Sequence, residues 1–374
     1  MNFDDKKNIK TKARVIAYYL PQFHPIPEND EWWGKGFTEW TNVGNAKPLF
    51  KGHYQPRVPA DLGYYDLRLP EVREAQAEMA RNAGVEGFLY WHYWFGNGRK
   101  VLERVFTEVL QSGKPGFPFC LGWANHSWNN HDWNPTEQWA RRKDIISQTY
   151  PGKIDYENHF YSLLEAFHDK RYIKVAGRPL FLVFSLSDLP NPKELVDIWN
   201  NLAVKNGLDG IHFVGRAVST KSLESLKVGF DAINSTGEWL AEEHIRGRLI
   251  RILLQRMRRY IGGLTLDVYP YGSIIKHIFN DTDKLENVYP TIIPQWDRSP
   301  RSGRRAVIYH GSTPELFRSH VNDALNLIAH KQYEKRILFL KSWNEWGEGN
   351  YMEPDLVHGH GYLNALRDAL FIGV

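Results

Sequence analysis

The feature that most constrains this sequence is its alternation of short apolar runs with longer segments of helical period. Segments with the 3.6-residue period of amphipathic helices lie at 69–84, 152–169, 192–207 and 313–330. Strands that alternate with helices form parallel sheets, and eight of them favour an α/β fold, a single (β/α)8 or TIM barrel with long loops after its strands. The eight predicted strands, rich in β-branched and aromatic residues, are RVIAYYL (14–20), GFLYWHYW (87–94), FPFCLGWA (117–124), RPLFLVFS (178–185), IHFVGRA (211–217), FDAINS (230–235), YPTIIPQW (289–296) and ILFLKSWN (337–344).

The domain organisation follows from the same pattern. We expect an N-terminal tail over residues 1–13 and one barrel domain over 14–374, because no linker, repeat or low-complexity tract divides the chain. A doubly wound open sheet is the alternative arrangement. Nucleotide-binding members of that class carry a glycine-rich phosphate loop after the first strand, and this sequence has none there. The barrel is therefore the preferred prediction.

Charge, cysteine content and hydropathy exclude several classes of function. A net charge of +4 on 374 residues does not indicate a nucleic-acid partner. The single cysteine, Cys120, cannot form an internal disulfide, and its apolar surroundings predict a buried thiol. The first residues lack the apolar core of a signal peptide, and no run reaches the roughly 18 apolar residues of a membrane span. We therefore expect a soluble, cytoplasmic protein.

Polar and aromatic side chains gather in the segments that leave the predicted strands, where barrels of this kind place their chemistry. Aromatic rings can stack on the C–H faces of pyranose rings, and the chain has 14 Trp, so these segments favour a carbohydrate site. Filling a large core is the alternative use of the aromatic rings, and bracing a loop is the alternative for each residue singly. The predicted substrate contacts are Tyr19, His24, Trp33, Glu39, Trp40, Trp91, His92, Tyr93, Trp123, Asn125, His126, Trp128, Asp132, Trp296, Asp297, Trp343, Asn344, Trp346 and Glu353.

Two of the glutamates that follow the eighth predicted strand are candidate catalytic residues. Glu345 and Glu348 are three positions apart in a segment with Gly347 and Gly349, and a tight turn there would bring both side chains to one face. Carboxylates held close repel each other, so one keeps a proton near neutral pH and the other stays charged. Glycoside hydrolysis requires such a pair. The alternative is a pair of solvated loop glutamates. Glu353 could either bind a sugar hydroxyl or orient the other two.

We expect no metal and no cofactor. His126, His131 and Asp132 lie close in sequence, but neither an H-E-x-x-H nor a C-x-x-C spacing is present. The absence of a G-x-S-x-G segment argues against a serine hydrolase of the α/β type.

Three long segments carry a resemblance to a known family. YYLPQFHPIPENDEWWGKGFTEWTNV (18–43), GFLYWHYWF (87–95) and SWNEWGEGNYMEP (342–354) resemble the WbsX-like family, which is related to glycoside hydrolase family 99 and is often described as glycosyltransferases or lipopolysaccharide biosynthesis proteins. The resemblance extends from about residue 14 to HGYLNALRDAL (360–370).

This resemblance implies a barrel that acts, without metal, on α-linked mannose-like sugars in a polysaccharide such as O-antigen or mannan, with retention of configuration. The E-W-x-E motif of family 99 corresponds to Glu345-Trp346-Gly347-Glu348. By position, Glu345 would be the base that deprotonates the sugar 2-hydroxyl to give a 1,2-anhydro intermediate. The ordinary retaining route would instead use one carboxylate as the direct nucleophile, and the sequence alone does not choose between the two. Glu348 is the general acid, and later the base that activates water. Gly347 departs from the pattern, because family 99 endomannosidases carry His there, so the linkage that is cleaved is open.

Two other functions stay open at this point. One is a glycosyltransferase or transglycosylase in lipopolysaccharide or capsule assembly, although no D-x-D motif for a metal-bound diphosphate is recognisable. The other is a non-catalytic barrel in which the same glutamates only bind sugar hydroxyls.

An arginine-rich segment lies between the sixth and seventh predicted strands. EEHIRGRLIRILLQRMRRYIGGL (242–264) combines six arginines with Leu, Ile and Met at helical spacing. Such a helix can bind an anionic membrane surface or an acidic glycan. The alternative is a barrel helix whose charged face is solvated.

Overall fold

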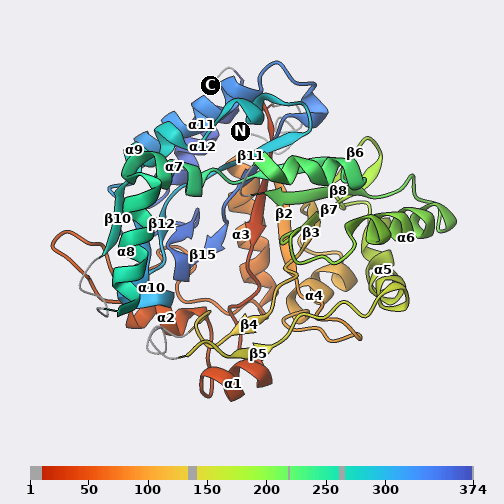
Figure 1. Ribbon diagram of the computed structural model, residues 1–374, viewed down its shortest axis with the longest axis horizontal. Helices are drawn as coiled ribbons and strands as arrows, with labels where there is room; N and C mark the ends of the chain where they lie inside the picture. The colour runs from red at the N-terminus through yellow and green to blue at the C-terminus, as the bar shows by residue number, and fades with distance from the viewer. Residues whose placement is uncertain (1–10, 134–140, 218–219, 261–265, 373–374) are drawn as a thin grey trace.

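Eight parallel strands close on themselves to form the barrel that the sequence predicts. The computed structural model describes residues 11–133, 141–217, 220–260 and 266–372 (Figure 1). Each barrel strand pairs in parallel with the next along the chain, and β14 pairs with β1 to close the ring. Of the expected tail, residues 1–10 lie outside the described residues. The barrel strands are β1 (Arg14–Tyr19), β2 (Val85–His92), β3 (Phe119–Trp123), β7 (Arg178–Val183), β8 (His212–Ala217), β9 (Ala232–Ser235), β11 (Val288–Ile292) and β14 (Ile337–Leu340).

These strands read as nearly continuous apolar runs because both of their faces are buried, one in the barrel and one under helices. Neighbouring side chains on a strand nevertheless point to opposite faces. Tyr18 points into the barrel, where its ring lies 4.8 Å from that of Trp91. Tyr19 points outward, and its hydroxyl donates to Gln76 of the surrounding helix layer at 2.7 Å. This alternation decides which residues at the strand ends can reach a central site.

The helices between the strands form the outer layer, and the four predicted from periodicity are confirmed. Prolines start α3, α6 and α11, and the side chains of Asn191 and Thr313 cap α6 and α11 by accepting from the backbone. Cys120 is fully buried, as expected. The helices are α3 (Pro70–Asn82), α4 (Arg104–Ser112), α5 (Lys153–His168), α6 (Pro192–Lys205), α11 (Pro314–Ile328) and α12 (Gly361–Leu370).

Insertions after three strands build the rest of the molecule. The loop after β1 carries α1 (Pro27–Trp33) and α2 (Glu39–Asn45). The segments after β9 and β11 form a three-stranded sheet in the order β10–β13–β12, next to the barrel. The seventh predicted strand is shorter than expected: it ends at Ile292, and a bend at Pro294 moves Trp296 into this small sheet. The elements are α7 (Glu238–Arg246), α8 (Arg248–Tyr260), β10 (Asp267–Pro270), α9 (Tyr271–His277), β12 (Trp296–Asp297), α10 (Ser299–Ser302) and β13 (Val307–His310).

Short elements complete the fold. Within the described residues, no helix has both the length and the apolar content needed to cross a bilayer. The short strands are β4 (Trp128–Asn129), β5 (Asp144–Ile146), β6 (Lys174–Val175), β15 (Asn344–Glu345) and β16 (Asn350–Tyr351), and the 3-10 helices are η2 (Thr220–Val228), η3 (Asp281–Lys284), η4 (Gly303–Arg305), η5 (Tyr333–Lys335) and η6 (Trp346–Glu348).

Candidate active site

A cavity of about 440 Å³ opens at the carboxyl ends of the barrel strands. It contains both candidate catalytic glutamates and six of the predicted contacts: the lining includes Glu345, Glu348, Trp91, Tyr93, His126, Trp128, Asp132 and Trp296. The structure adds lining residues that the sequence analysis did not single out, namely Tyr18, Leu20, Ala124, Trp133, Phe184, Arg216, Glu238, Trp239, Glu242, Arg251, Arg298, Arg301, Val307, Tyr309 and Lys341.

The two glutamates are presented by a hairpin-like turn made of β15, η6 and β16. Asn344 fixes the start of the turn to the end of β1, because its side-chain amide donates to the carbonyl of Leu20 at 3.0 Å and accepts from the Leu20 N–H at 2.8 Å. Gly349 ends η6 with φ +55°, a left-handed conformation that favours glycine. The predicted turn is therefore present, and it brings both carboxyl groups to the cavity.

Gly347 is needed for space rather than for backbone freedom, which differs from the sequence-based expectation. Its φ is not positive, but a Cβ atom at this position would lie 1.5 Å from Oε1 of Glu39. Glu39 is fully buried and comes from α2 in the long first loop. The Glu39 carboxylate thus occupies the volume that any side chain at position 347 would require.

Arg301 connects this buried carboxylate to the candidate catalytic pair. Its guanidinium makes two hydrogen bonds of 2.9 Å to the two oxygens of Glu39. A third nitrogen, Nη1, lies 2.9 Å from Oε1 of Glu348, and Nη2 lies 3.8 Å from Oε1 of Glu345. Nε of Arg298 approaches the same Glu348 oxygen at 3.1 Å. Glu348 therefore lies within 3.1 Å of two cations, whereas the guanidinium of Arg301 is 3.8 Å from Glu345.

These surroundings separate the proton affinities of the two glutamates. Burial and the neighbouring charge of Glu348 raise the pKa of Glu345 to about 8. Burial would also raise the pKa of Glu348, but Arg298 and Arg301 outweigh it and lower this pKa to about 2. The two carboxyl groups are hydrogen-bonded to each other. Near neutral pH the pair therefore holds one proton, and the neighbouring cations favour its position on Glu345.

Aromatic rings, charged groups that pair with one another and other polar side chains line the remaining walls. Trp128 packs edge-on against Tyr93, with ring centres 5.1 Å apart. The Lys341 ammonium lies 4.1 Å from the centre of the Trp296 ring and pairs with Glu238. Burial lowers the pKa of His126, which favours the neutral imidazole. Flat rings beside neutral hydrogen-bonding groups are suited to sugar faces and hydroxyls.

Three predicted contacts lie outside the cavity because they are on the outward face of their strands. Tyr19 donates to Gln76, as described above. Nε2 of His92 lies 2.9 Å from Nε2 of His159 on α5, and Nε1 of Trp123 donates to the carbonyl of Trp94 at 2.9 Å. These side chains tie the barrel to its outer layer.

The predicted contacts of the first loop do not line the cavity, and two of them, Glu39 and Trp40, brace the loop through hydrogen bonds. The Glu39 carboxylate accepts hydrogen bonds from Arg301. The indole N–H of Trp40 donates to the carbonyl of Tyr65 at 2.7 Å. Trp33 packs near Phe37. His24 is buried, and burial lowers its pKa to about 4.

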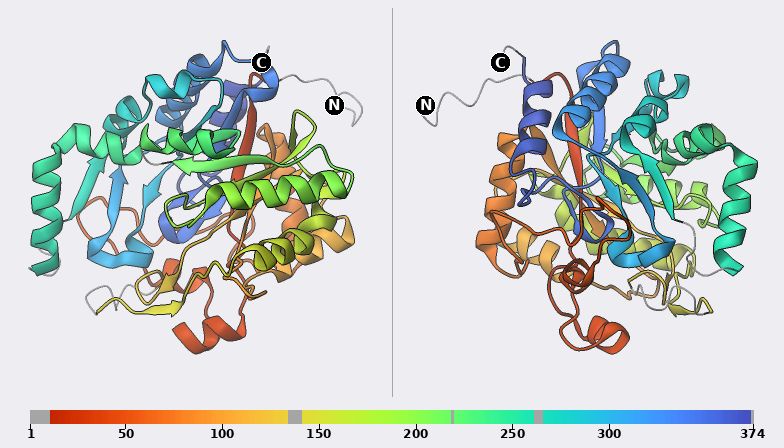
Figure 2. Two further views of the ribbon diagram at one scale, coloured as in Figure 1. Left: turned by 45° about the vertical axis from the view of Figure 1, so that its right-hand side comes forward. Right: turned by 90° about the vertical axis from the view of Figure 1, so that its left-hand side faces the viewer.

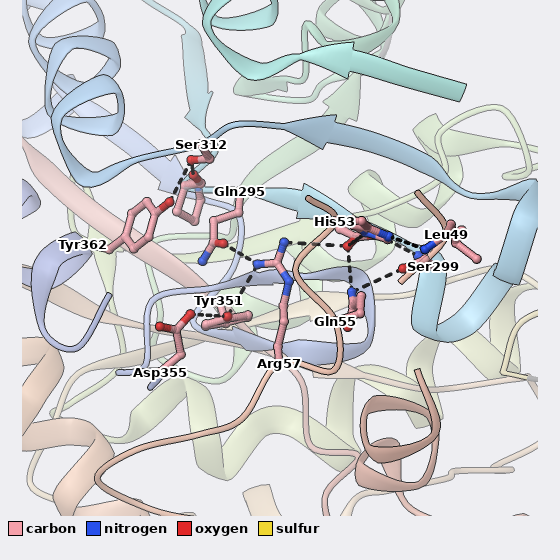
Figure 3. A network of polar contacts seen from close by, with 12 residues as sticks. Leu49, His53, Gln55, Arg57, Gln295, Ser299, Ser312, Tyr351, Asp355 and Tyr362 are labelled. Atoms are coloured by element: carbon pink, nitrogen blue, oxygen red, sulfur yellow. Dashed lines mark hydrogen bonds and ion pairs between the residues drawn. The ribbon is translucent and has the colours of Figure 1, made fainter. Parts of the chain in front are cut away.

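Asn125 and Asp297 also hold loops together instead of lining the cavity. Asn125 donates to the carbonyl of Ser185 at 2.8 Å and accepts from the Ser185 N–H at 2.7 Å. Asp297 accepts from Nε2 of His53 at 2.8 Å and from Nε2 of Gln55 at 2.6 Å. Figure 3 shows this region, in which polar contacts made by Asp297 and Arg57 join His53, Gln55, Gln295, Ser299 and Tyr351 into one network.

The last four predicted contacts support the turn that carries Glu345 and Glu348. They are Trp343, Asn344, Trp346 and Glu353. Glu353 is 4% exposed and accepts four hydrogen bonds. The indole N–H groups of Trp343 and Trp346 donate to its two oxygens at 3.1 and 2.6 Å. The Tyr65 hydroxyl and the Gln76 amide donate at 2.9 and 2.6 Å. Glu353 therefore orients the turn, as one of its two expected roles required, and is not among the residues that line the cavity.

This arrangement predicts a large stability effect for Glu353→Gln. Each oxygen of Glu353 receives two donors, so a side-chain NH2 in place of either oxygen would face two N–H or O–H groups. We expect a loss of about 2–4 kcal/mol of unfolding free energy, since buried donors left without an acceptor cost about 1–3 kcal/mol each. Urea unfolding of the variant and of Glu165→Gln, a control at an exposed position of α5, measures the difference. An equal stability of the two variants would contradict the bracing role.

Among the described residues, no group of three or more His, Cys, Asp or Glu side chains is arranged to hold a metal ion.

Comparison with known proteins places the chain in a family. The family model described as Glycosyltransferase WbsX matches residues 15–366. The chain belongs to the WbsX family. It is 34% identical over 365 residues to WxcX of Xanthomonas campestris pv. campestris, covering 96% of this chain and 50% of WxcX. This WbsX chain thus spans about half the length of the curated relatives it matches.

Solved structures support the barrel fold of this WbsX chain. The GH99 endo-α-mannosidase of Bacteroides thetaiotaomicron superimposes with a TM-score of 0.57 at 14% identity, covering 95% of each chain. A glycoside hydrolase-like protein superimposes with a TM-score of 0.58 at 15% identity, covering 98% of this chain and 96% of the other. At these identities the likeness concerns the fold.

Proposed function

We propose that this chain is a retaining glycoside hydrolase that acts on α-linked mannose-like sugars in a polysaccharide such as O-antigen or mannan. The observation that carries the proposal is the buried, hydrogen-bonded pair of Glu345 and Glu348, which holds one proton inside an aromatic-lined cavity. The GH99 endo-α-mannosidase shares the barrel fold, and its substrate class is the one we assign to this chain.

The reaction needs one base and one acid, and the pair supplies both. In our assignment Glu345 takes the proton of the sugar 2-hydroxyl, O2 attacks the anomeric carbon of the same sugar, and Glu348 gives its proton to the departing oxygen. Glu348 then takes a proton from water, the hydroxide attacks the anomeric carbon and breaks its bond to O2, and Glu345 returns its proton to O2. The single proton of the pair must therefore lie on Glu348 when the glycosidic bond breaks, and the hydrogen bond between the two carboxyl groups provides its path from Glu345.

Carboxyl groups joined by a hydrogen bond lie closer than the roughly 6.5–9.5 Å of inverting glycosidases, whose pairs leave room for a water molecule between acid and base. This closeness supports retention. It also supports attack by a substrate hydroxyl, because the two carboxyl groups share one side of the cavity.

Release of reducing sugar tests the proposal. We expect wild-type protein to release reducing ends from one member of a panel of α-mannans, α-rhamnans and bacterial O-polysaccharides, with the Glu345→Gln/Glu348→Gln double variant as the blank. If the wild type released no more reducing sugar than the blank from any member of the panel, the result would contradict hydrolysis.

The family description favours a second candidate, a glycosyltransferase or transglycosylase of surface-polysaccharide assembly. Release of nucleoside diphosphate from a sugar donor, dependent on an acceptor glycan, would support it against hydrolysis. Glycan binding that is unchanged in the double variant, without turnover, would instead support a non-catalytic barrel.

The shared proton predicts a one-sided pH profile. The pKa of Glu345 is raised to about 8, so the pair keeps its proton below that pH and loses it above. We expect kcat/KM to fall about tenfold per pH unit above about pH 8, since one proton is then missing from the active form. A rate that keeps rising to pH 10 would contradict a role for the shared proton.

A further inference from the structure

Helix α8 turns its apolar side toward solvent. Leu249, Leu253 and Met257 follow one another at the four-residue spacing that places side chains on one helix face, and their exposed fractions are 82%, 58% and 37%. Ile250, beside them, is 57% exposed. Figures 1 and 2 show α8 at the outer edge of the molecule, away from the barrel. No part of the described chain buries this face.

The side of α8 that faces the protein carries an arginine. The guanidinium of Arg251 lies 3.5 Å from the centre of the Trp239 ring, and its Nη2 lies 3.1 Å from Oε2 of Glu242. Arg251 is buried, whereas its apolar neighbours are exposed. Helices of globular proteins have the opposite arrangement. The alternative expected from the sequence, a barrel helix with a solvated charged face, accounts for exposed arginines but not for the exposed apolar side chains of α8.

The charge of the helix complements an anionic surface. Residues 248–260 include five arginines and no aspartate or glutamate. Arg248 and Arg256 are exposed next to the apolar face. Apolar side chains flanked by arginines are the pattern of helices that lie in the headgroup region of membranes with anionic lipids.

We propose that α8 docks this protein on the surface of an anionic lipid bilayer. Leu249, Ile250 and Leu253 enter the boundary between headgroups and acyl chains, and Arg248 and Arg256 contact lipid phosphates. Trp239, which is 51% exposed on the adjacent α7, lies at the same rim.

The location of the helix gives this docking a consequence for the cavity. Trp239, Glu242 and Arg251 belong to the α7–α8 pair and also line the cavity. Docking through α8 therefore holds the cavity mouth next to the bilayer, where glycans carried by membrane lipids are presented. The docking itself does not depend on the reaction at Glu345 and Glu348.

Vesicle flotation tests the proposal. We expect wild-type protein to float with vesicles of phosphatidylcholine and phosphatidylglycerol at low ionic strength, to float less at 0.5 M salt, and to stay unbound with phosphatidylcholine alone. Leu249→Ser/Leu253→Ser should lower the partition coefficient at least about tenfold, because two exposed leucines no longer enter the bilayer. Arg248→Gln/Arg256→Gln should lower it by a similar factor and weaken its salt dependence.

The matched control is Ile154→Ser/Val204→Ser, which removes two apolar side chains that are 75% and 66% exposed on α5 and α6. It should float like the wild type. Loss of binding in this control, equal binding to both kinds of vesicle, or no binding at low ionic strength would overturn the proposal. So would a dimer, seen by light scattering, that Leu249→Ser/Leu253→Ser dissociates, or arginine-dependent binding to an acidic polysaccharide without any vesicle binding.

Discussion

Glu345→Gln and Glu348→Gln will each lower kcat/KM for polysaccharide hydrolysis by about 10³- to 10⁴-fold, because positioned acid–base groups contribute about 10²–10⁴-fold and the two here share a single proton. Their effects on stability should differ. Glu345 is protonated near neutral pH, so the amide resembles its native state, and thermal unfolding should change little. Glu348 is the charged partner of Arg298 and Arg301, so Glu348→Gln leaves these cations less compensated and should unfold more easily.

The same two variants distinguish base from acid. On an aryl α-mannoside whose leaving group needs no protonation, Glu348→Gln should recover most of its kcat/KM, which reports the first step, whereas Glu345→Gln should remain inactive. Recovery in Glu345→Gln alone would contradict our assignment and make Glu345 the acid, in agreement with its raised pKa.

Gly347→Ala will lower kcat/KM by about 10²-fold or more, the cost of displacing a catalytic group by roughly 1 Å. The new Cβ would lie 1.5 Å from Oε1 of Glu39, which is fully buried and held by both of its hydrogen bonds to Arg301. Relief of this overlap must move Arg301, and Arg301 contacts Glu348. Steady-state kinetics on the same polysaccharide measures the effect.

Gly44→Ala is the matched control, because this glycine in α2 has open space around its Cβ position and no positive φ. It should leave kcat/KM unchanged. Glu39→Asp, which shortens the carboxylate by one CH2, should restore part of the activity of Gly347→Ala, since it withdraws the clashing oxygen. Equal activity of Gly347→Ala and Gly44→Ala would contradict the steric role.

The steric overlap with Glu39 explains why position 347 is glycine in this chain. Family 99 endomannosidases are expected to carry histidine there, and in this chain Glu39 from the first loop fills that volume. Glu39 and its partner Arg301 are 262 positions apart in the sequence. No local pattern reveals such a pair, which is why the sequence analysis assigned Glu39 to substrate contact.

The barrel could be predicted because its signal is local and repeated. Strands that are buried on both faces are continuous apolar runs in the sequence, and eight such runs alternating with helices are compatible with few folds. The face of the strand on which each side chain lies is predicted less well than the strands themselves. Tyr18 and Trp91 face the cavity, while their neighbours Tyr19 and His92 face the helices. The period of two along a strand could have separated them, since Tyr18, Trp91 and Tyr93 all occupy inward positions.

The stereochemistry of hydrolysis tests the central claim most directly. Proton NMR of the anomeric signals during the first minutes of a reaction identifies the configuration of the newly released sugar before mutarotation. A hydrogen-bonded Glu345–Glu348 pair that uses the substrate 2-hydroxyl predicts that the α-glycoside first yields the α-anomer. First appearance of the β-anomer would contradict it, because inversion requires a water molecule placed between two separated carboxyl groups.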